Sequence, residues 1–221
     1  MKKMIVCGAI AFALCLLTAQ SARSQGTVYV SSLGQPSSGS SAVCSDSWQA
    51  EQFATGNNPG GYVLDSIQLA MTPGSGAPND FSVMIYSGGG LAFAAPGSYL
   101  STLTGSTDPV TGGEFTYSSS GLPLQASRTY FIVLTAGTSV ANGAYAWSLE
   151  NTSPPVYSGG WPSDFCHETS SDGMSWNGTA GVPQYSITAT AVPEPETLYL
   201  LGLPGLLFFA WRRWRAKAKA R

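Results

Sequence analysis

Tyr130-Phe131-Ile132-Val133-Leu134 is the stretch that decides the fold of this chain. A strand with one solvated face alternates apolar and polar residues, because successive side chains point to opposite faces of the sheet. Here the apolar residues are continuous instead. The stretch therefore predicts a central β-strand, Thr129–Thr135, that is covered on both sides.

The segments around it carry shorter strand patterns. Phe81, Val83 and Ile85 share one face, which is typical of a half-buried strand. The segment Tyr62–Leu69 alternates from Leu64 onward, with Leu64 offset by one residue or by a bulge. The other predicted strands are Trp48–Thr55, Tyr62–Met71, Phe81–Tyr86, Glu114–Tyr117, Tyr145–Leu149 and Tyr185–Thr190.

These strands are separated by Gly, Pro, Asn and Asp turns, and helical periodicity is almost absent. The pattern predicts an all-β domain over residues 25–191, an antiparallel β-sandwich of jelly-roll-like type. About 167 residues are enough for one domain with a hydrophobic core.

The charge of this domain restricts its partners. Arg128 is its one cation and stands against ten acidic residues, a formal net charge of −9. Nucleic-acid binding needs clustered Lys and Arg, so the composition excludes it.

The N-terminus has the organisation of a secretory signal peptide, predicted over residues 1–24. Lys2 and Lys3 precede an apolar stretch from Met4 to about Leu17, and small residues follow. A retained anchor or a buried helix is the alternative. It is disfavoured because the apolar stretch is short for a bilayer span.

The C-terminus, residues 192–221, has three parts in order. The motif Pro193-Glu194-Pro195 precedes an apolar helix predicted over 198–211, and a basic end, 212–221, follows. The apolar run would extend roughly 21 Å, less than a hydrocarbon core of about 30 Å. The cations of the basic end predict a cytoplasmic tail and an external body; they are Arg212, Arg213, Arg215, Lys217, Lys219 and Arg221.

This arrangement closely resembles the PEP-CTERM sorting signal of Gram-negative bacteria. The resemblance implies recognition by an exosortase at the Pro193–Pro195 motif and only transient insertion in the inner membrane. It also implies delivery to the cell surface or extracellular matrix, in association with exopolysaccharide and biofilm. A plain single-pass membrane anchor is the alternative.

The body resembles the choice-of-anchor R domains that accompany such tails. The resemblance covers residues 46–190 and rests on Trp48–Phe53, Tyr62–Leu69, Phe81–Tyr86, Leu122–Leu134 and Trp147. It implies an extracellular β-sandwich that is attached by varied anchors, and it does not imply an activity.

Two cysteines, Cys44 and Cys166, remain after removal of the signal peptide. In an exported protein an even pair predicts one disulfide. Two separate thiols are the alternative.

No residue pattern specifies a catalytic or metal site. His167 lies between Cys166 and Glu168, but a disulfide would remove the thiolate that zinc needs, so a solvated loop is expected there. Glu51, Glu114, Glu150 and Glu168 are the candidates for acid–base chemistry, but most are expected on solvated strands or turns. A structural Ca²⁺ at Asn79-Asp80 or Asp172-Gly173 is disfavoured. We therefore expect no catalytic residue, no metal and no cofactor.

Aromatic residues offer the best candidate binding site. Most Trp and Tyr residues are expected in the core of a sandwich of this size. Trp161 and Trp176 are flanked by Gly, Pro, Ser and Asn, which predicts exposure and a second hypothesis, a carbohydrate-binding module. A secreted hydrolase is a third and weaker hypothesis.

Overall fold

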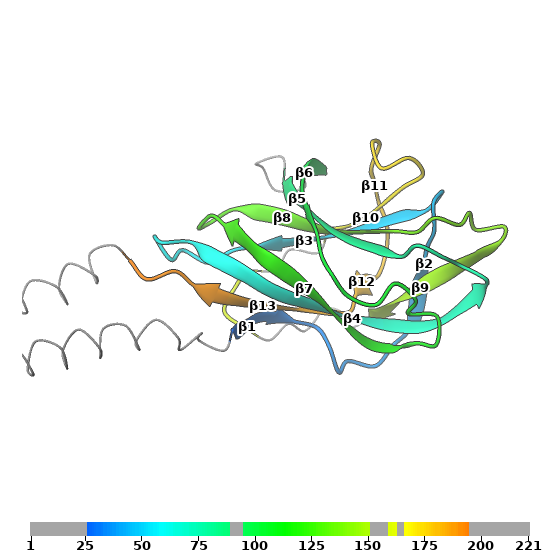
Figure 1. Cartoon of the computed structure of the whole chain (residues 1–221), viewed down its shortest axis with the longest axis horizontal. Helices are drawn as coiled ribbons and strands as arrows, with labels where there is room; N and C mark the ends of the chain where they lie inside the picture. The colour runs from blue at the N-terminus through cyan, green and yellow to red at the C-terminus, as the bar shows by residue number, and fades with distance from the viewer. Residues whose placement is uncertain (1–25, 89–94, 151–158, 163–165, 195–221) are drawn as a thin grey trace, which may run out of the picture.

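The computed structural model describes residues 26–88, 95–150, 159–162 and 166–194, and within them it contains two antiparallel β-sheets that pack face to face (Figure 1). The predicted all-β fold is therefore confirmed. The predicted signal peptide, the apolar C-terminal segment 198–211 and the basic end lie outside the described residues.

The first sheet has seven strands. Its main order is β1 (Thr27–Ser31), β13 (Tyr185–Ala191), β4 (Tyr62–Gly76), β9 (Gly143–Glu150) and β12 (Val182–Pro183). Two further strands join it, β2 (Gly39–Val43) beside β9 and β7 (Gly113–Leu124) beside β4.

The second sheet has six strands. Their order is β11 (Asn177–Gly178), β10 (His167–Ser170), β3 (Trp48–Ala54), β8 (Thr129–Thr135), β5 (Ser82–Gly88) and β6 (Pro96–Thr102). Strand β8 is central, because β3 and β5 pair with its two edges. The chain passes from one sheet to the other at most connections, so each sheet is built from segments far apart in sequence.

Strand β8 has the predicted bounds and both of its faces are buried. Tyr130, Ile132 and Leu134 belong to the core between the sheets. Phe131 and Val133 point to the outer face, and both have an exposed fraction of 0%. The prediction of a central strand that is covered on both sides is therefore confirmed.

The predicted irregularity at Leu64 is a bulge centred on Asp65. The pairing of β4 with β13 passes from Ser66 to Leu64 without Asp65, and the pairing with β7 shifts at the same place. The Thr190 hydroxyl donates a 2.8 Å hydrogen bond to Asp65 Oδ2. The bulge keeps Leu64 and Ile67 buried on the core side.

The core lies between the two sheets and is rich in aromatic residues. Its largest fully buried side chains are Trp147, Tyr117, Tyr145, Tyr185 and Phe53. Phe131 is equally buried but lies on the outer face of the six-stranded sheet. Phe81, Val83 and Ile85 share the inner face of β5, as predicted.

No helix that is long and apolar enough to span a membrane occurs among the described residues.

Candidate functional site

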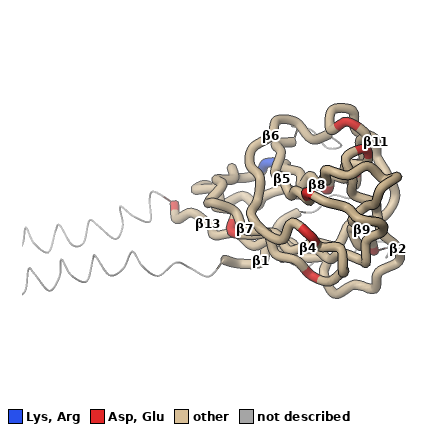
Figure 2. Tube along the Cα trace, turned by 45° about the vertical axis from the view of Figure 1, so that its right-hand side comes forward, with Lys and Arg blue, Asp and Glu red and all other residues tan. Residues whose placement is uncertain are grey.

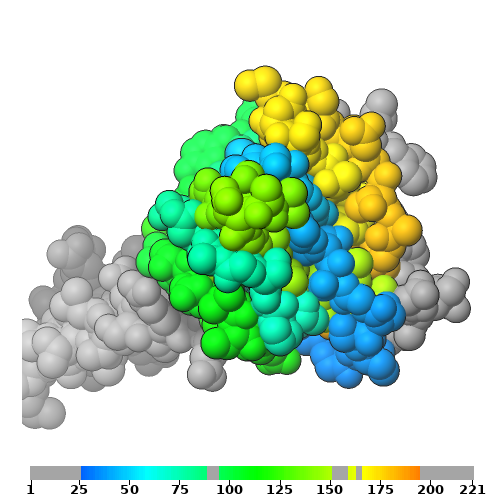
Figure 3. Space-filling view, turned by 90° about the vertical axis from the view of Figure 1, so that its right-hand side faces the viewer, coloured from blue at the N-terminus to red at the C-terminus, as the bar shows by residue number. Residues whose placement is uncertain are grey.

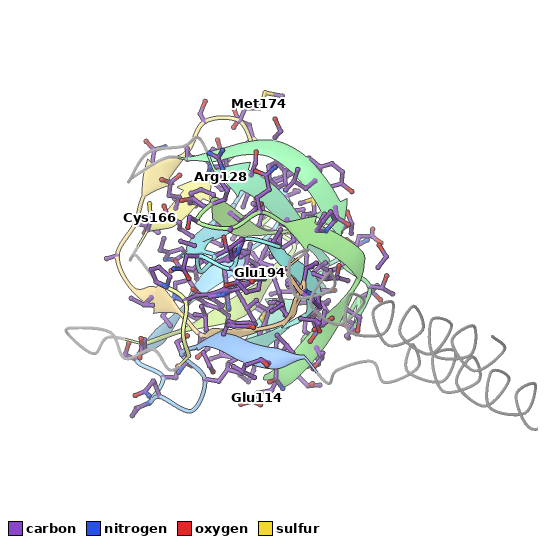
Figure 4. The ribbon with its side chains drawn as sticks, turned by 90° about the vertical axis from the view of Figure 1, so that its left-hand side faces the viewer. Glu114, Arg128, Cys166, Met174 and Glu194 are labelled. Atoms are coloured by element: carbon purple, nitrogen blue, oxygen red, sulfur yellow. The ribbon has the colours of Figure 1, made fainter. Side chains whose placement is uncertain are left out.

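Both ends of the sandwich lie at one pole. Strands β1 and β13 are neighbouring antiparallel strands, and Thr27 lies opposite Ala189. The start of β1 and the end of β13 therefore emerge side by side (Figure 1). We call this end the tail pole, and Figure 4 views it with Glu194 near its middle.

The start of the sorting motif is attached directly to the sheet at the tail pole. Ala191 still pairs with Tyr62 of β4, and the Val192 amide donates a 3.0 Å hydrogen bond to the Gly61 carbonyl. Pro193 and Glu194 follow at once, with both residues described; Pro195 and the basic residues Arg212, Arg213 and Arg215 are not among the described residues.

The outer face of the six-stranded sheet carries a second apolar cluster, which we call the outer cluster. It consists of Ala50, Met84, Phe131 and Val133, with Trp48, Tyr86 and Trp176 packed against it. Tyr99 of β6 extends it, because its ring makes an edge contact with Tyr86 at 5.8 Å while 53% of the residue is exposed. This face therefore offers aromatic and apolar surface to a partner.

The two tryptophans that are predicted to be exposed, Trp176 and Trp161, differ in burial. Trp176 is half-buried at the edge of the outer cluster. Trp161 is only 6% exposed and lies in the core, stacked between Tyr29 at 4.7 Å and Phe53 at 6.1 Å. The prediction that Trp161 is exposed is wrong, since its ring is unavailable to a ligand.

Gly159, two residues before Trp161, explains this error. A Cβ at Gly159 would lie 2.0 Å from the carbonyl oxygen of Tyr29, and the Trp161 amide bonds that carbonyl at 3.1 Å. Gly159 permits close approach to β1 and so brings the indole inward, whereas the flanking small and polar residues alone predict an exposed ring.

The predicted disulfide is absent, because Cys44 and Cys166 are not bonded to each other. Cys44 pairs through its backbone with Ser47, next to the start of β3. Cys166 precedes His167, and His167 pairs with Glu51 farther along β3. The register thus separates the two cysteines by several residues along the strand, and a disulfide needs Cα atoms within about 7 Å. Burial raises the pKa of Cys44 to about 11, so this thiol stays protonated at neutral pH.

His167 is a buried strand residue, which corrects the expected solvated loop. It is 4% exposed, and its Nε2 lies 3.0 Å from Oε1 of Gln49 on the inner side of the sheet. The Cys166 thiol instead donates to Glu168 Oε1 at 3.3 Å, on the opposite side. Because His167 alternates with its two neighbours, the three side chains do not converge on one ion.

The burial of His167 has an electrostatic consequence. Loss of solvation lowers its pKa from 6.5 to about 4, although backbone hydrogen bonds to Ala180 and Gly181 act in the opposite direction. His167 is therefore neutral at physiological pH and serves the packing between the sheets, with its ring 6.2 Å from that of Trp147.

Three of the four glutamates considered for acid–base chemistry are buried, contrary to expectation. Glu51 and Glu150 are 0% exposed and Glu168 is 7% exposed, whereas Glu114 accepts a hydrogen bond from Gln68 at the surface. Glu51 and Glu150 lie on strands of different sheets, β3 and β9, and each has an interaction partner.

In one of the two turns considered for Ca²⁺, Asp172-Gly173, the carboxylate is engaged by hydrogen bonds within the turn. Asp172 Oδ1 accepts the amides of Met174 and Ser175 at 2.8 and 2.9 Å, and the pKa of Asp172 is lowered by these bonds and by that from Ser170. No group of three or more His, Cys, Asp or Glu residues suited to a metal is present within the described ranges. Figure 3 faces the pole opposite the tail, where the yellow segment that includes this turn forms one edge.

Charge is sparse over the sandwich. Figure 2 shows scattered acidic positions and one cationic position, Arg128, in the part of the chain that the structure describes. The tail pole therefore offers the start of the sorting motif, and the six-stranded sheet offers the outer cluster.

Sequence reasoning missed Trp48, Tyr86 and Tyr99 as a shared surface, and Asn58 and Gly60 beside the motif. Tyr86 and Tyr99 pair directly across β5 and β6. Trp48 and Ala50 share one face of β3 while the polar Gln49 and Glu51 lie on the other, so the local pattern did not mark the face of Trp48 as the outer one. The pairing of β5 with β6 has no local signal either.

Comparison with protein-family models matches residues 191–215 to the PEP-CTERM protein-sorting motif. The search of curated proteins found no match to this chain. The family match covers the tail alone, and such a motif implies exosortase-dependent export and sorting to the cell surface in Gram-negative bacteria.

Proposed function

We propose that this chain is a non-enzymatic surface or matrix protein whose sandwich associates with exopolysaccharide through the outer cluster and Tyr99. The sorting motif supports delivery to the cell surface. The proposal includes a signal peptide at 1–24, transient insertion of the tail in the inner membrane, and a jelly-roll-like body of the choice-of-anchor R type associated with biofilm.

The observation that carries the proposal is the contrast between the outer faces of the two sheets. The outer side of β13 carries Ser186, Thr188 and Thr190, and the neighbouring outer side of β4 carries Gln68. The six-stranded sheet instead presents Trp48, Tyr86, Tyr99 and Trp176.

Aromatic rings on a sheet face suit a sugar polymer. The apolar faces of pyranose rings stack on aromatic rings, and a row of half-exposed rings can follow several sugar units without a deep pocket. The net charge of −9 over residues 25–191 favours a neutral polymer over a strongly anionic one.

The geometry of the acids supports a non-enzymatic role. A glycosidase needs two carboxyl groups across a cleft. Glu51 points to the inner side of β3, because it is one residue away from Ala50 of the outer cluster, and Glu168 lies on the other side of the sheet.

The test is retention of the full-length protein on exopolysaccharide from the native host. We expect wild type to be retained, and Tyr99→Ala and Trp176→Ala to be released at least several-fold more readily. Val28→Ala is the matched control, because Val28 is 46% exposed on the seven-stranded sheet. Equal retention of all four proteins would contradict a role for the outer cluster.

The same samples test the enzymatic alternatives. We expect the size distribution of the polymer to stay constant during prolonged incubation with wild type. Shortened chains, measured by size-exclusion chromatography, would instead support a secreted hydrolase.

A further inference from the structure

The loop of residues 56–61 connects β3 to β4. It binds both the amide and the carbonyl of Val192, the residue before the sorting motif. The Val192 amide donates to the Gly61 carbonyl at 3.0 Å. The Asn58 side chain donates from Nδ2 to the Val192 carbonyl at 2.9 Å and to the Gly61 carbonyl at 2.6 Å. Both backbone polar groups of Val192 are therefore bound by this loop.

The loop itself is a tight turn that places Asn58 for this contact. The Gly61 amide donates to the Asn58 carbonyl at 2.8 Å, and the Asn58 amide bonds the hydroxyl of Tyr62 at 3.3 Å. Tyr62 in turn is 5% exposed in the core, next to Trp161. The position of Asn58 is thus set by the packed sandwich and not by the tail.

Gly60 allows the tail to lie against the loop. A Cβ at residue 60 would lie 2.4 Å from the Val192 carbonyl oxygen and 3.2 Å from the carbonyl oxygen of Pro193. A side chain at this position would push the tail away from the loop. Gly60 leaves the space for the Val192 carbonyl, and the Asn58 side-chain amide binds that same carbonyl.

We infer that the 56–61 loop is a clamp that restrains exosortase processing, through Asn58 and Gly60. The inference rests on the proposed sorting of this chain by an exosortase. A protease-like active site takes its substrate as an extended peptide with free backbone groups on both sides of the motif. Here Val192, directly before the motif, is part of the folded sheet, so its backbone groups become available only when the end of β13 opens.

Such local opening is set by the bonds that hold the strand end. Where opening and closing are fast, attack on an opened segment follows the population of the open form. Loss of one ordinary hydrogen bond raises that population about fivefold. The clamp thus makes the rate of tail removal depend on whether the body is folded. In a folded body a few hydrogen bonds restrain the tail, whereas in an unfolded body nothing does.

The test is the rate of tail loss in the native host, followed by pulse labelling and intact mass of the full-length chain. We expect Asn58→Ala to speed tail loss about fivefold. Asn58→Asp should have the same effect, because a carboxylate keeps the shape but cannot donate to the Val192 carbonyl. Gly60→Ala should also speed tail loss, since it displaces Val192 sterically. Asn57→Ala is the matched control and should leave the rate unchanged, because Asn57 is the exposed neighbour.

Amide exchange at Val192 in the purified full-length chain reports the clamp without the enzyme. We expect faster exchange at Val192 in Asn58→Ala than in wild type, with the β8 amides unchanged. Faster exchange with an unchanged or slower rate of tail loss would overturn the inference. If wild type kept its tail in the host, the sorting proposal itself would fail, a different outcome from an equal processing rate in all variants.

Discussion

Strands β4 and β8 are both central in their sheets, yet they are buried differently. β4 is paired on both edges, by β13 and β7, and buried residues alternate with half-buried ones along most of its length. β8 is paired by β3 and β5, and its five middle residues are all buried. Pairing satisfies the backbone of both strands, so the difference lies in what covers the outer face.

The outer face of β8 is covered by side chains from its own sheet and from one turn. Trp48 and Tyr86 come from neighbouring strands, and Trp176 follows the turn at residues 171–175. A Cβ at Gly173 would lie 2.9 Å from the Trp48 ring, so this turn packs directly on the indole. The six-stranded sheet therefore has an apolar cluster on each of its faces, whereas the seven-stranded sheet has such a cluster on its inner face.

The greatest loss of stability is expected from a change at Phe131. Phe131→Ala removes a ring of 0% exposure from the outer face and should lower the free energy of unfolding by about 3–5 kcal/mol. The matched change on β4 is Gln68→Ala, which removes a surface contact with Glu114 and should cost less than about 0.5 kcal/mol. Urea unfolding of both variants measures the difference. Equal costs would mean that the outer face of β8 is not a second core.

A smaller loss of stability is expected on the inner side of the same sheet, where His167 makes the free energy of unfolding depend on pH. The pKa of His167 falls from 6.5 in the unfolded chain to about 4 in the folded one, so the unfolded chain binds more protons between these values. The contribution of neutral His167 to stability is therefore complete above pH 6.5 and is lost as the pH falls toward 4. Stability at pH 5 should be lower than at pH 7.5 by about 2 kcal/mol from this residue alone.

The control for this prediction is His167→Gln, which cannot titrate. Other titratable groups are common to both proteins, so the informative quantity is the difference between their unfolding free energies at the two pH values. An identical pH dependence in wild type and His167→Gln would show that His167 is solvated.

The smallest stability effect is expected at the exposed margin of the outer cluster. Tyr99 is 53% exposed, so Tyr99→Ala should change the free energy of unfolding by less than about 0.5 kcal/mol, measured by urea unfolding. If Tyr99→Ala also lost retention on the polysaccharide, Tyr99 would serve binding and not the packing of the outer face. A large destabilisation would instead assign Tyr99 to the outer cluster as a covering residue.

The sequence predicted the strands that carry strong patterns. The bounds of β8, the bulge near Leu64 and the shared face of Phe81, Val83 and Ile85 are as expected. The strands that were missed are β1, β2, β6, β10, β11 and β12. Most of these are short, lie at edges or carry polar residues, as in the segment GSSAV of β2, so tertiary pairing decides their structure and local preference does not.

The site was predictable only where the signal is local. The sorting motif was recognised because its three parts follow one another in sequence, and the family match at 191–215 confirms it. The disulfide and the exposure of Trp161 were wrong, because both depend on strand register and on the close approach at Gly159, which local sequence does not encode. The outer cluster and the Asn58 clamp join residues from separate strands and had no local signal either.

Intact mass of the protein from its native host, beside a Glu194→Ala variant, tests the central claim most directly. We expect wild type to lack the C-terminal basic residues and the variant to retain them. A wild-type chain that ends at Arg221 would contradict exosortase-dependent sorting, and the tail would then be a plain membrane anchor.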